Sequence, residues 1–200
     1  MIYTVYVDEK NATSQQIYQS ALRILEAEGP QAVSMRRVAK EVGITPMAIY
    51  HHFPSRDALL NSIVNTEFTR LGDFFGNLNG KHSFETAMVR LMDGYIDYAL
   101  AHPRIFDYVF SAPRPGARRF PDDFRARRSP TLNVTADTVS SWMKAGRLKR
   151  DDPWEVALAL WAHVHGYLML WRGDRFHLSE EEFRKLIHRS LRRFLHGLAS

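Results

Sequence analysis

A pair of short helical segments joined at a glycine constrains this chain more than any other feature of its sequence. Within residues 34–53, Ser34 is positioned to cap one short helix and Gly43 to end it, and a Thr-Pro pair two residues later is a typical start for a second helix. Ala39 is small enough for the two helices to cross closely, and glycine tolerates the left-handed backbone of a tight turn. The segment therefore predicts a helix-turn-helix, whose second helix lies in the DNA major groove. A plain helical hairpin is the alternative interpretation.

The remainder of the chain also reads as helices separated by glycine and proline, because apolar residues recur at helical spacing within each segment. We expect helices over residues 14–28, 34–42, 45–52, 55–77, 83–101, 104–110, 131–145, 152–171 and 179–198, and we expect 111–130 to be mainly loop with one turn near 122–127. Only residues 2–7 alternate as a strand would, and they have no evident partner. The sequence therefore predicts an all-α fold.

Composition and motif content exclude several kinds of chemistry. Cysteine is absent from the 200 residues, which excludes disulfides, thiolate nucleophiles, zinc-thiolate sites and iron–sulfur clusters. On a helix, His51 and His52 lie about 100° apart and His163 and His165 about 200° apart, so neither pair shares a metal ion. The sequence has no nucleophile elbow, phosphate loop or His-Glu-x-x-His motif. We therefore expect no catalytic residues, no metal site, no cofactor and no enzyme activity.

The longest uncharged run argues against a membrane span. Residues 156–171 form 16 positions without Asp, Glu, Lys or Arg, and a transmembrane helix needs roughly 18 to 20. The N-terminus lacks the basic and apolar regions of a signal peptide. We expect a soluble cytoplasmic protein with no membrane partner.

The net charge of +5 gives little support for DNA binding. The excess lies in residues 71–150, which carry 13 Lys and Arg against 8 Asp and Glu, and much of it lies in the arginine-rich stretch 111–130. A basic surplus often indicates nucleic-acid binding, but this one lies outside the helix-turn-helix. The DNA-binding prediction therefore depends on the motif and not on the charge.

Residues 14–71 resemble the DNA-binding region of the tetracycline-repressor (TetR) family. The matching stretches are Ala21…Leu25…Gly29, Ser34-x-Arg36-x-Val38-Ala39-x-x-Val42-Gly43, Ile49-Tyr50-x-His52-Phe53 and Arg56-x-x-Leu59-Leu60. Farther along, Trp161-(x)3-His165-Gly166 is similar to a helix in one branch of the family's C-terminal domains.

The resemblance implies an all-helical homodimer. It implies a three-helix helix-turn-helix domain over 14–60, and residues 1–13 lie outside the resemblance as an N-terminal extension. A larger helical domain over 61–200 would bind a small effector and dimerise. The implied function is transcriptional regulation by a repressor, which a small apolar or aromatic effector releases from a pseudo-palindromic double-stranded DNA operator. A small-molecule-binding enzyme carrying a helix-turn-helix and a helical interaction module are the alternatives.

The resemblance also implies roles for individual residues at the DNA. Arg36 matches a position that reaches base edges, where arginine can contact guanine with two hydrogen bonds. The first turn of the recognition helix, which faces the bases, consists of Thr45, Pro46, Met47 and Ala48. Positions that contact phosphates are matched by Ser34, Tyr50, His52 and Arg56. Packing alone is the alternative for Tyr50, and a structural role within the fold is the alternative for His52.

Aromatic and methionine side chains in the C-terminal half suggest a ligand pocket, since such pockets are mostly apolar with few polar groups. The candidates are Tyr95, Tyr98, Phe106, Phe110, Trp142, Trp161, His165 and Met169, with His165 as the polar group. For any one of them, an ordinary core position is the alternative.

The last two predicted helices suggest a dimer interface. The helix from residue 153 to 171 is apolar nearly all round, and such a helix is buried on every side. We expect one face to pack into its own subunit and the other against a partner. The last helix carries a broad apolar stripe suited to the same four-helix contact. We expect the interface to contain Trp154, Leu158, Leu168, Phe183, Ile187, Leu191 and Phe194. Burial within one subunit is the alternative.

Overall fold

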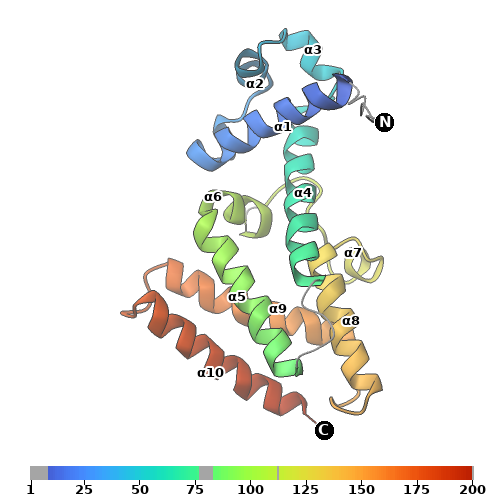
Figure 1. The fold of residues 1–200 in the computed structure, drawn as a ribbon, viewed down its shortest axis with the longest axis vertical. Coiled ribbons are helices and arrows are strands. Elements are labelled where there is room, and N and C mark those ends of the chain that lie inside the picture. Colours follow the sequence, from blue (N-terminus) through green and yellow to red (C-terminus); the bar gives the residue numbers. More distant parts are fainter. Residues whose placement is uncertain (1–8, 77–82, 112, 200) are drawn as a thin grey trace, which may run out of the picture. The chain divides into compact units, whose positions relative to one another are not determined.

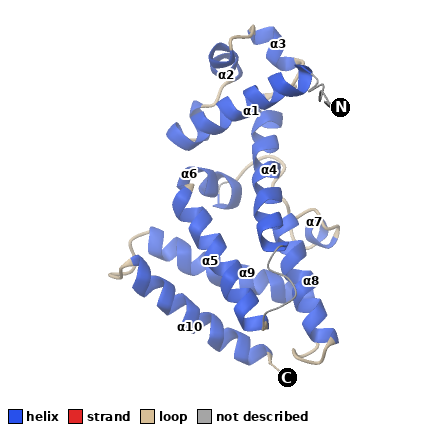
Figure 2. Ribbon diagram, in the orientation of Figure 1, coloured by secondary structure: helices blue, strands red, loops and turns tan. Residues whose placement is uncertain are grey.

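The computed structural model describes residues 9–76, 83–111 and 113–199 (Figure 1). Helices dominate these ranges and no strand occurs within them (Figure 2). Their one β-type contact is an isolated bridge between Leu148 and Ala199. The predicted all-α fold is therefore confirmed, and the strand-like residues 2–7 lie outside the described part of the chain.

Contacts divide the chain into two compact units. Unit 1 comprises residues 1–67 and 99–117, and unit 2 comprises residues 68–98 and 118–200. Two of the three boundaries fall within long helices, α4 (Arg56–Gly76) and α5 (Phe84–Ala101), and the third follows Ala117. The predicted functional domains, 14–60 and 61–200, are defined differently and stay predictions.

Unit 1 begins with the helices of the predicted helix-turn-helix region. These are α1 (Glu9–Glu28), the 3-10 turn η1 (Pro30–Ala32), α2 (Met35–Val42) and α3 (Pro46–Tyr50), followed by the first part of α4. Later in the chain, α6 (Pro103–Phe106) and the π-helical turn η2 (Asp107–Ser111) also belong to this unit. The fully buried side chains of Ile17, Leu25, Val38, Ile49 and Leu59 form part of its core.

Local chemistry sets the ends of these helices. The Ser34 hydroxyl accepts a hydrogen bond from the main-chain nitrogen of Arg37 and so caps α2. Gly43 ends α2 with φ of 79°, in the left-handed region that glycine favours. The predicted start of the first helix at Ser14 is wrong, because α1 already begins at Glu9.

Unit 2 is built from parts of α4 and α5 together with α7 (Asp122–Arg125), α8 (Pro130–Lys144), α9 (Pro153–Arg172) and α10 (Glu180–Leu198). The helix α9 packs against both α8 and α10 (Figure 1). A capping box begins α10, since Ser179 and Glu182 cap the helix reciprocally. No described helix is long and apolar enough to cross a membrane.

Three of the six arginines in the arginine-rich stretch pair with acidic side chains of their own unit. Arg127 contacts the Asp137 carboxylate with two hydrogen bonds, of 2.9 and 2.7 Å. Arg128 pairs with Asp123, and Arg125 pairs with Asp152. These ion pairs give much of the local positive charge a partner within the fold.

Candidate DNA-binding surface and effector cavity

The candidate recognition helix α3 is anchored on one side and exposed on the other. Ile49 is fully buried, whereas Met47 is 72% exposed and Tyr50 is 48% exposed. The Thr45 hydroxyl accepts from the main-chain nitrogen of Ala48 at 3.1 Å, which fixes the first turn. The residues predicted to face DNA therefore lie on a short, well-capped helix that presents an apolar and aromatic face.

Two basic side chains of α2 are exposed and have no hydrogen bond or ion pair within the described residues. They are Arg36 and Lys40, which lie on one face of the helix because they are four residues apart. Sequence reasoning selected Arg36 and missed Lys40, although the four-residue spacing could have indicated it. Both cations are available for a phosphate or a base edge.

The neighbouring Arg37 is occupied within the protein. Its guanidinium donates to the two carboxylate oxygens of Glu28 at 2.9 and 2.5 Å. This hydrogen bonding raises the pKa of Arg37 above its usual value and lowers the pKa of Glu28. Arg37 thus holds α2 against α1, and Arg36 is the free arginine of the pair.

Two residues predicted to contact phosphates are also held by the fold. The Arg56 guanidinium donates to the main-chain carbonyl of Val33 at 2.7 Å and to that of Pro30. The Nδ1 atom of His52 lies 2.9 Å from the Ser14 hydroxyl. Both interactions stabilise the helix-turn-helix region, which comprises α1 to α3. The DNA roles of Arg56 and His52 stay predictions.

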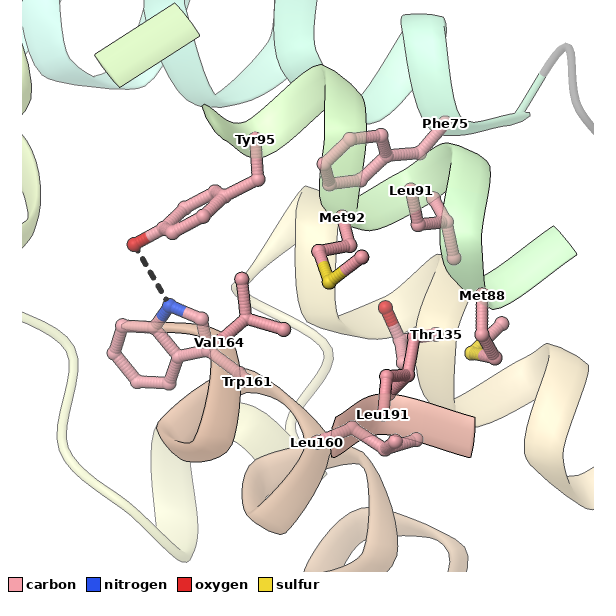
Figure 3. Close-up of a pocket in the computed structure, with 10 residues that line it drawn as sticks. All are labelled: Phe75, Met88, Leu91, Met92, Tyr95, Thr135, Leu160, Trp161, Val164 and Leu191. Carbon is pink, nitrogen blue, oxygen red and sulfur yellow. Dashed lines mark hydrogen bonds between the residues drawn. The ribbon is translucent and has the colours of Figure 1, made fainter. Parts of the chain in front are cut away.

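A cavity of about 60 Å³ lies within unit 2 (Figure 3). The side chains around it come from α4, α5, α8, α9 and α10, and none carries a charge. They are Phe75, Met88, Leu91, Met92, Tyr95, Thr135, Leu160, Trp161, Val164 and Leu191. Tyr95 and Trp161 are the two predicted ligand residues that line it.

A hydrogen-bond chain crosses one end of this cavity. The indole nitrogen of Trp161 donates to the Tyr95 hydroxyl at 3.0 Å (Figure 3). That hydroxyl lies 2.9 Å from Nδ1 of His165, so His165 contacts the cavity through Tyr95. Burial raises the pKa of Tyr95, which keeps its hydroxyl neutral.

The other predicted ligand residues lie outside the lining. Phe106 and Phe110 pack on each other in unit 1, with ring centroids 5.0 Å apart. Trp142 packs on Phe84 at the end of α8, and Met169 is 36% exposed. Tyr98 is half-buried on α5 but does not reach the cavity.

Four residues predicted for the dimer interface are buried in the core of their own subunit. Leu168, Phe183, Ile187 and Leu191 have at most 1% exposure, so these side chains offer no surface to a partner in this structure. Trp154, Leu158 and Phe194 are partly buried. One face of α9 is exposed in the single chain, and the expectation that a partner subunit covers it stays a prediction. That face carries Ala159, Ala162, Gly166, Met169 and Leu170.

No cluster of three or more metal-ligating side chains occurs in the described part of the chain. The organised features of the described residues are an exposed helix-turn-helix with two unpaired cations and an apolar cavity.

These features define a helix-turn-helix regulator, and comparisons with known proteins agree. Residues 17–63 match the model for bacterial regulatory proteins of the tetR family, and residues 88–194 match the model for the tetracyclin repressor-like C-terminal domain. The chain belongs to the TetR family of transcriptional regulators. Its similarity to the Trp-(x)3-His-Gly branch stays a prediction.

Individual proteins are similar to this chain over most of its length. An uncharacterized HTH-type transcriptional regulator of Bacillus subtilis, YobS, is 20% identical over 93% of this chain and 92% of its own. A solved structure of a protein of unknown function from Rhodococcus sp. RHA1 is 24% identical, with a TM-score of 0.77 over 94% of this chain and 96% of that one. A TetR-family regulator from Pectobacterium atrosepticum is 18% identical, with a TM-score of 0.68 over 96% of each chain.

Proposed function

We propose that this regulator is a cytoplasmic homodimeric repressor that a small apolar or aromatic effector releases from a pseudo-palindromic operator. The observation that carries the proposal is the presence, in one chain, of an exposed helix-turn-helix and an apolar cavity without charged walls. A pure interaction module would need no such cavity, and an enzyme would need reactive groups in it.

The DNA side of the proposal rests on α2 and α3. Arg36 reads a base edge in the major groove, and Lys40 contacts a phosphate. Thr45, Pro46, Met47 and Ala48 offer few donors, so the first turn of α3 reads shape and thymine methyl groups. Ser34 and Tyr50 contact DNA phosphates and so position the helix-turn-helix on the duplex.

The dimer side rests on the exposed face of α9. Met169 is 36% and Leu170 50% exposed, and they continue a stripe of small residues at Ala159, Ala162 and Gly166. Small residues let two helices approach closely, and the apolar surface favours burial against a second copy. Leu158 and Phe194 extend this interface.

The switching side rests on the helices that line the cavity. An effector shifts the balance between two states only by binding one of them better. The helix α4 contributes Phe75 to the cavity, and its first part belongs to unit 1, which contains the helix-turn-helix. We therefore propose that α4 transmits the conformational change caused by effector binding. Tyr95, Trp161 and His165 sense the ligand.

Footprinting on the DNA upstream of the chain's own coding region tests the proposed function. We expect protection of two half-sites related by two-fold symmetry, because a symmetric dimer reads a symmetric site. Protection of a single half-site, or binding that does not discriminate against unrelated duplex, would contradict the proposal.

A further inference from the structure

The cavity presents polar atoms from only three of its lining residues. These are the Thr135 hydroxyl, the Tyr95 hydroxyl and the indole nitrogen of Trp161 (Figure 3). The remaining walls are hydrocarbon or thioether. A charged ligand would therefore be desolvated without a counter-charge, which is costly.

Trp161 and Thr135 direct their hydrogens at acceptors within the protein, and the Tyr95 hydroxyl lies within hydrogen-bond distance of another ring nitrogen. Trp161 donates to Tyr95 at 3.0 Å. A hydroxyl that accepts from an indole is well placed to donate onward, and Nδ1 of His165 lies 2.9 Å away. Thr135 donates to the main-chain carbonyl of Thr131 at 3.3 Å. In this arrangement a ligand meets acceptors, because a hydroxyl oxygen that donates its hydrogen keeps its lone pairs.

The size of the cavity points to a compact ligand. Its volume is about 60 Å³, whereas an engineered cavity of about 150 Å³ holds benzene. Met88 and Met92 form part of the wall, and unbranched thioether side chains readily change rotamer. A bound ring therefore requires these two side chains to move.

We infer that the effector is an uncharged single-ring arene whose polar group is a hydrogen-bond donor, as in phenol, and that the Thr135 oxygen accepts that hydrogen. This inference rests on the proposed function of the cavity as the effector site. It makes Thr135 a specificity-determining residue.

Calorimetric titration of the full chain at pH 7 with phenol, toluene and benzoate tests the inference. Toluene matches phenol in size but lacks the donor, and benzoate carries a charge. A neutral hydrogen bond contributes about 1 kcal/mol, so we expect phenol to bind about fivefold more tightly than toluene and benzoate not to bind. Thr135→Val removes the acceptor and should abolish the preference, and Thr135→Ser should retain it.

Thr138→Val is the matched control. Thr138 lies one turn along α8 and donates to the carbonyl of Val134 at 2.8 Å, in the same manner as Thr135, but it does not line the cavity. This variant should bind phenol and toluene like the parent.

The inference is overturned if benzoate binds as well as phenol, if the phenol preference survives Thr135→Val, or if none of the three compounds binds. A chain that ignores all three but protects its upstream DNA would retain its role as a DNA-binding regulator, whereas a chain that fails to bind DNA would lose that role whatever phenol does.

Discussion

The Arg56 guanidinium donates to the main-chain carbonyl of Val33 at 2.7 Å, which ties the start of α4 to the residue before the α2 cap. A second bond reaches the carbonyl of Pro30. Arg56, at the beginning of α4, therefore stabilises the connection between α1 and α2 in the helix-turn-helix region.

Arg56→Ala should lower the stability of the helix-turn-helix region. Loss of hydrogen bonds from a charged donor to two carbonyls costs about 1 to 3 kcal/mol. Thermal unfolding followed by circular dichroism should show a lower midpoint, and Arg36→Ala, which removes an arginine without such partners, should leave the midpoint unchanged. Equal midpoints for the parent and Arg56→Ala would contradict a bracing role.

Lys40→Ala should weaken binding to all DNA sequences alike. Removing one cation from a phosphate reduces the slope of log affinity against log salt by about 0.9, so a dimer, which carries two copies of Lys40, should show a slope smaller by about 1.8. Affinity measurements from 50 to 200 mM salt provide the slope. Lys185→Ala is a suitable control, since Lys185 lies on α10 and pairs with Glu181. An unchanged slope for Lys40→Ala would exclude the phosphate interaction.

Ala162→Glu should break the dimer. It places a carboxylate in the middle of the exposed apolar face of α9, where two copies would bury it without a partner. Light scattering at micromolar concentration should report the 23.2 kDa of one chain for this variant and twice that mass for the parent. Ala126→Glu, at an exposed position beside α7, should remain dimeric. A dimeric Ala162→Glu protein would place the interface elsewhere.

His163 should make the protein less stable as the pH falls. Burial lowers its pKa in the folded state, its Nε2 atom is buried without a hydrogen-bond partner among the described residues, and its ring packs on Tyr167 and Phe194. The unfolded chain therefore binds the proton more readily than the folded chain. The stability that depends on neutral His163 is present above the unfolded pKa of about 6.5, and it is lost as the pH falls through the folded pKa. Thermal unfolding should give a higher midpoint for His163→Phe than for the parent, and this difference should be larger at pH 5.5 than at pH 7.5. A constant difference would show that His163 does not titrate on unfolding.

The elements that the sequence predicted well are those set by local chemistry. Ser34, Gly43 and Thr45 mark the ends of α2 and α3 because a capping hydroxyl or a left-handed glycine acts on its own neighbours. The capping box at Ser179 is equally local. These signals could be read from single residues and short spacings.

The lining of the cavity and the exposed face of α9 depend on how helices pack. Leu191 and Leu170 are both apolar residues on helices, yet one is buried and lines the cavity while the other is 50% exposed. Helical spacing identifies an apolar position without showing which neighbour covers it. For the same reason, Phe106 resembled a pocket residue in the sequence, although it packs in the core of unit 1.

Base reading by Arg36 is central to the proposed recognition of the operator, and one titration tests it directly. Fluorescence anisotropy at fixed salt would compare the parent and Arg36→Ala on the footprinted operator and on unrelated duplex of equal length. We predict a loss of about 1 to 3 kcal/mol on the operator, with relaxed specificity at one position of each half-site. The loss on unrelated duplex should be smaller. Unchanged operator affinity for Arg36→Ala, or an equal loss on both duplexes, would contradict the assignment of α2 and α3 as the sequence-reading surface.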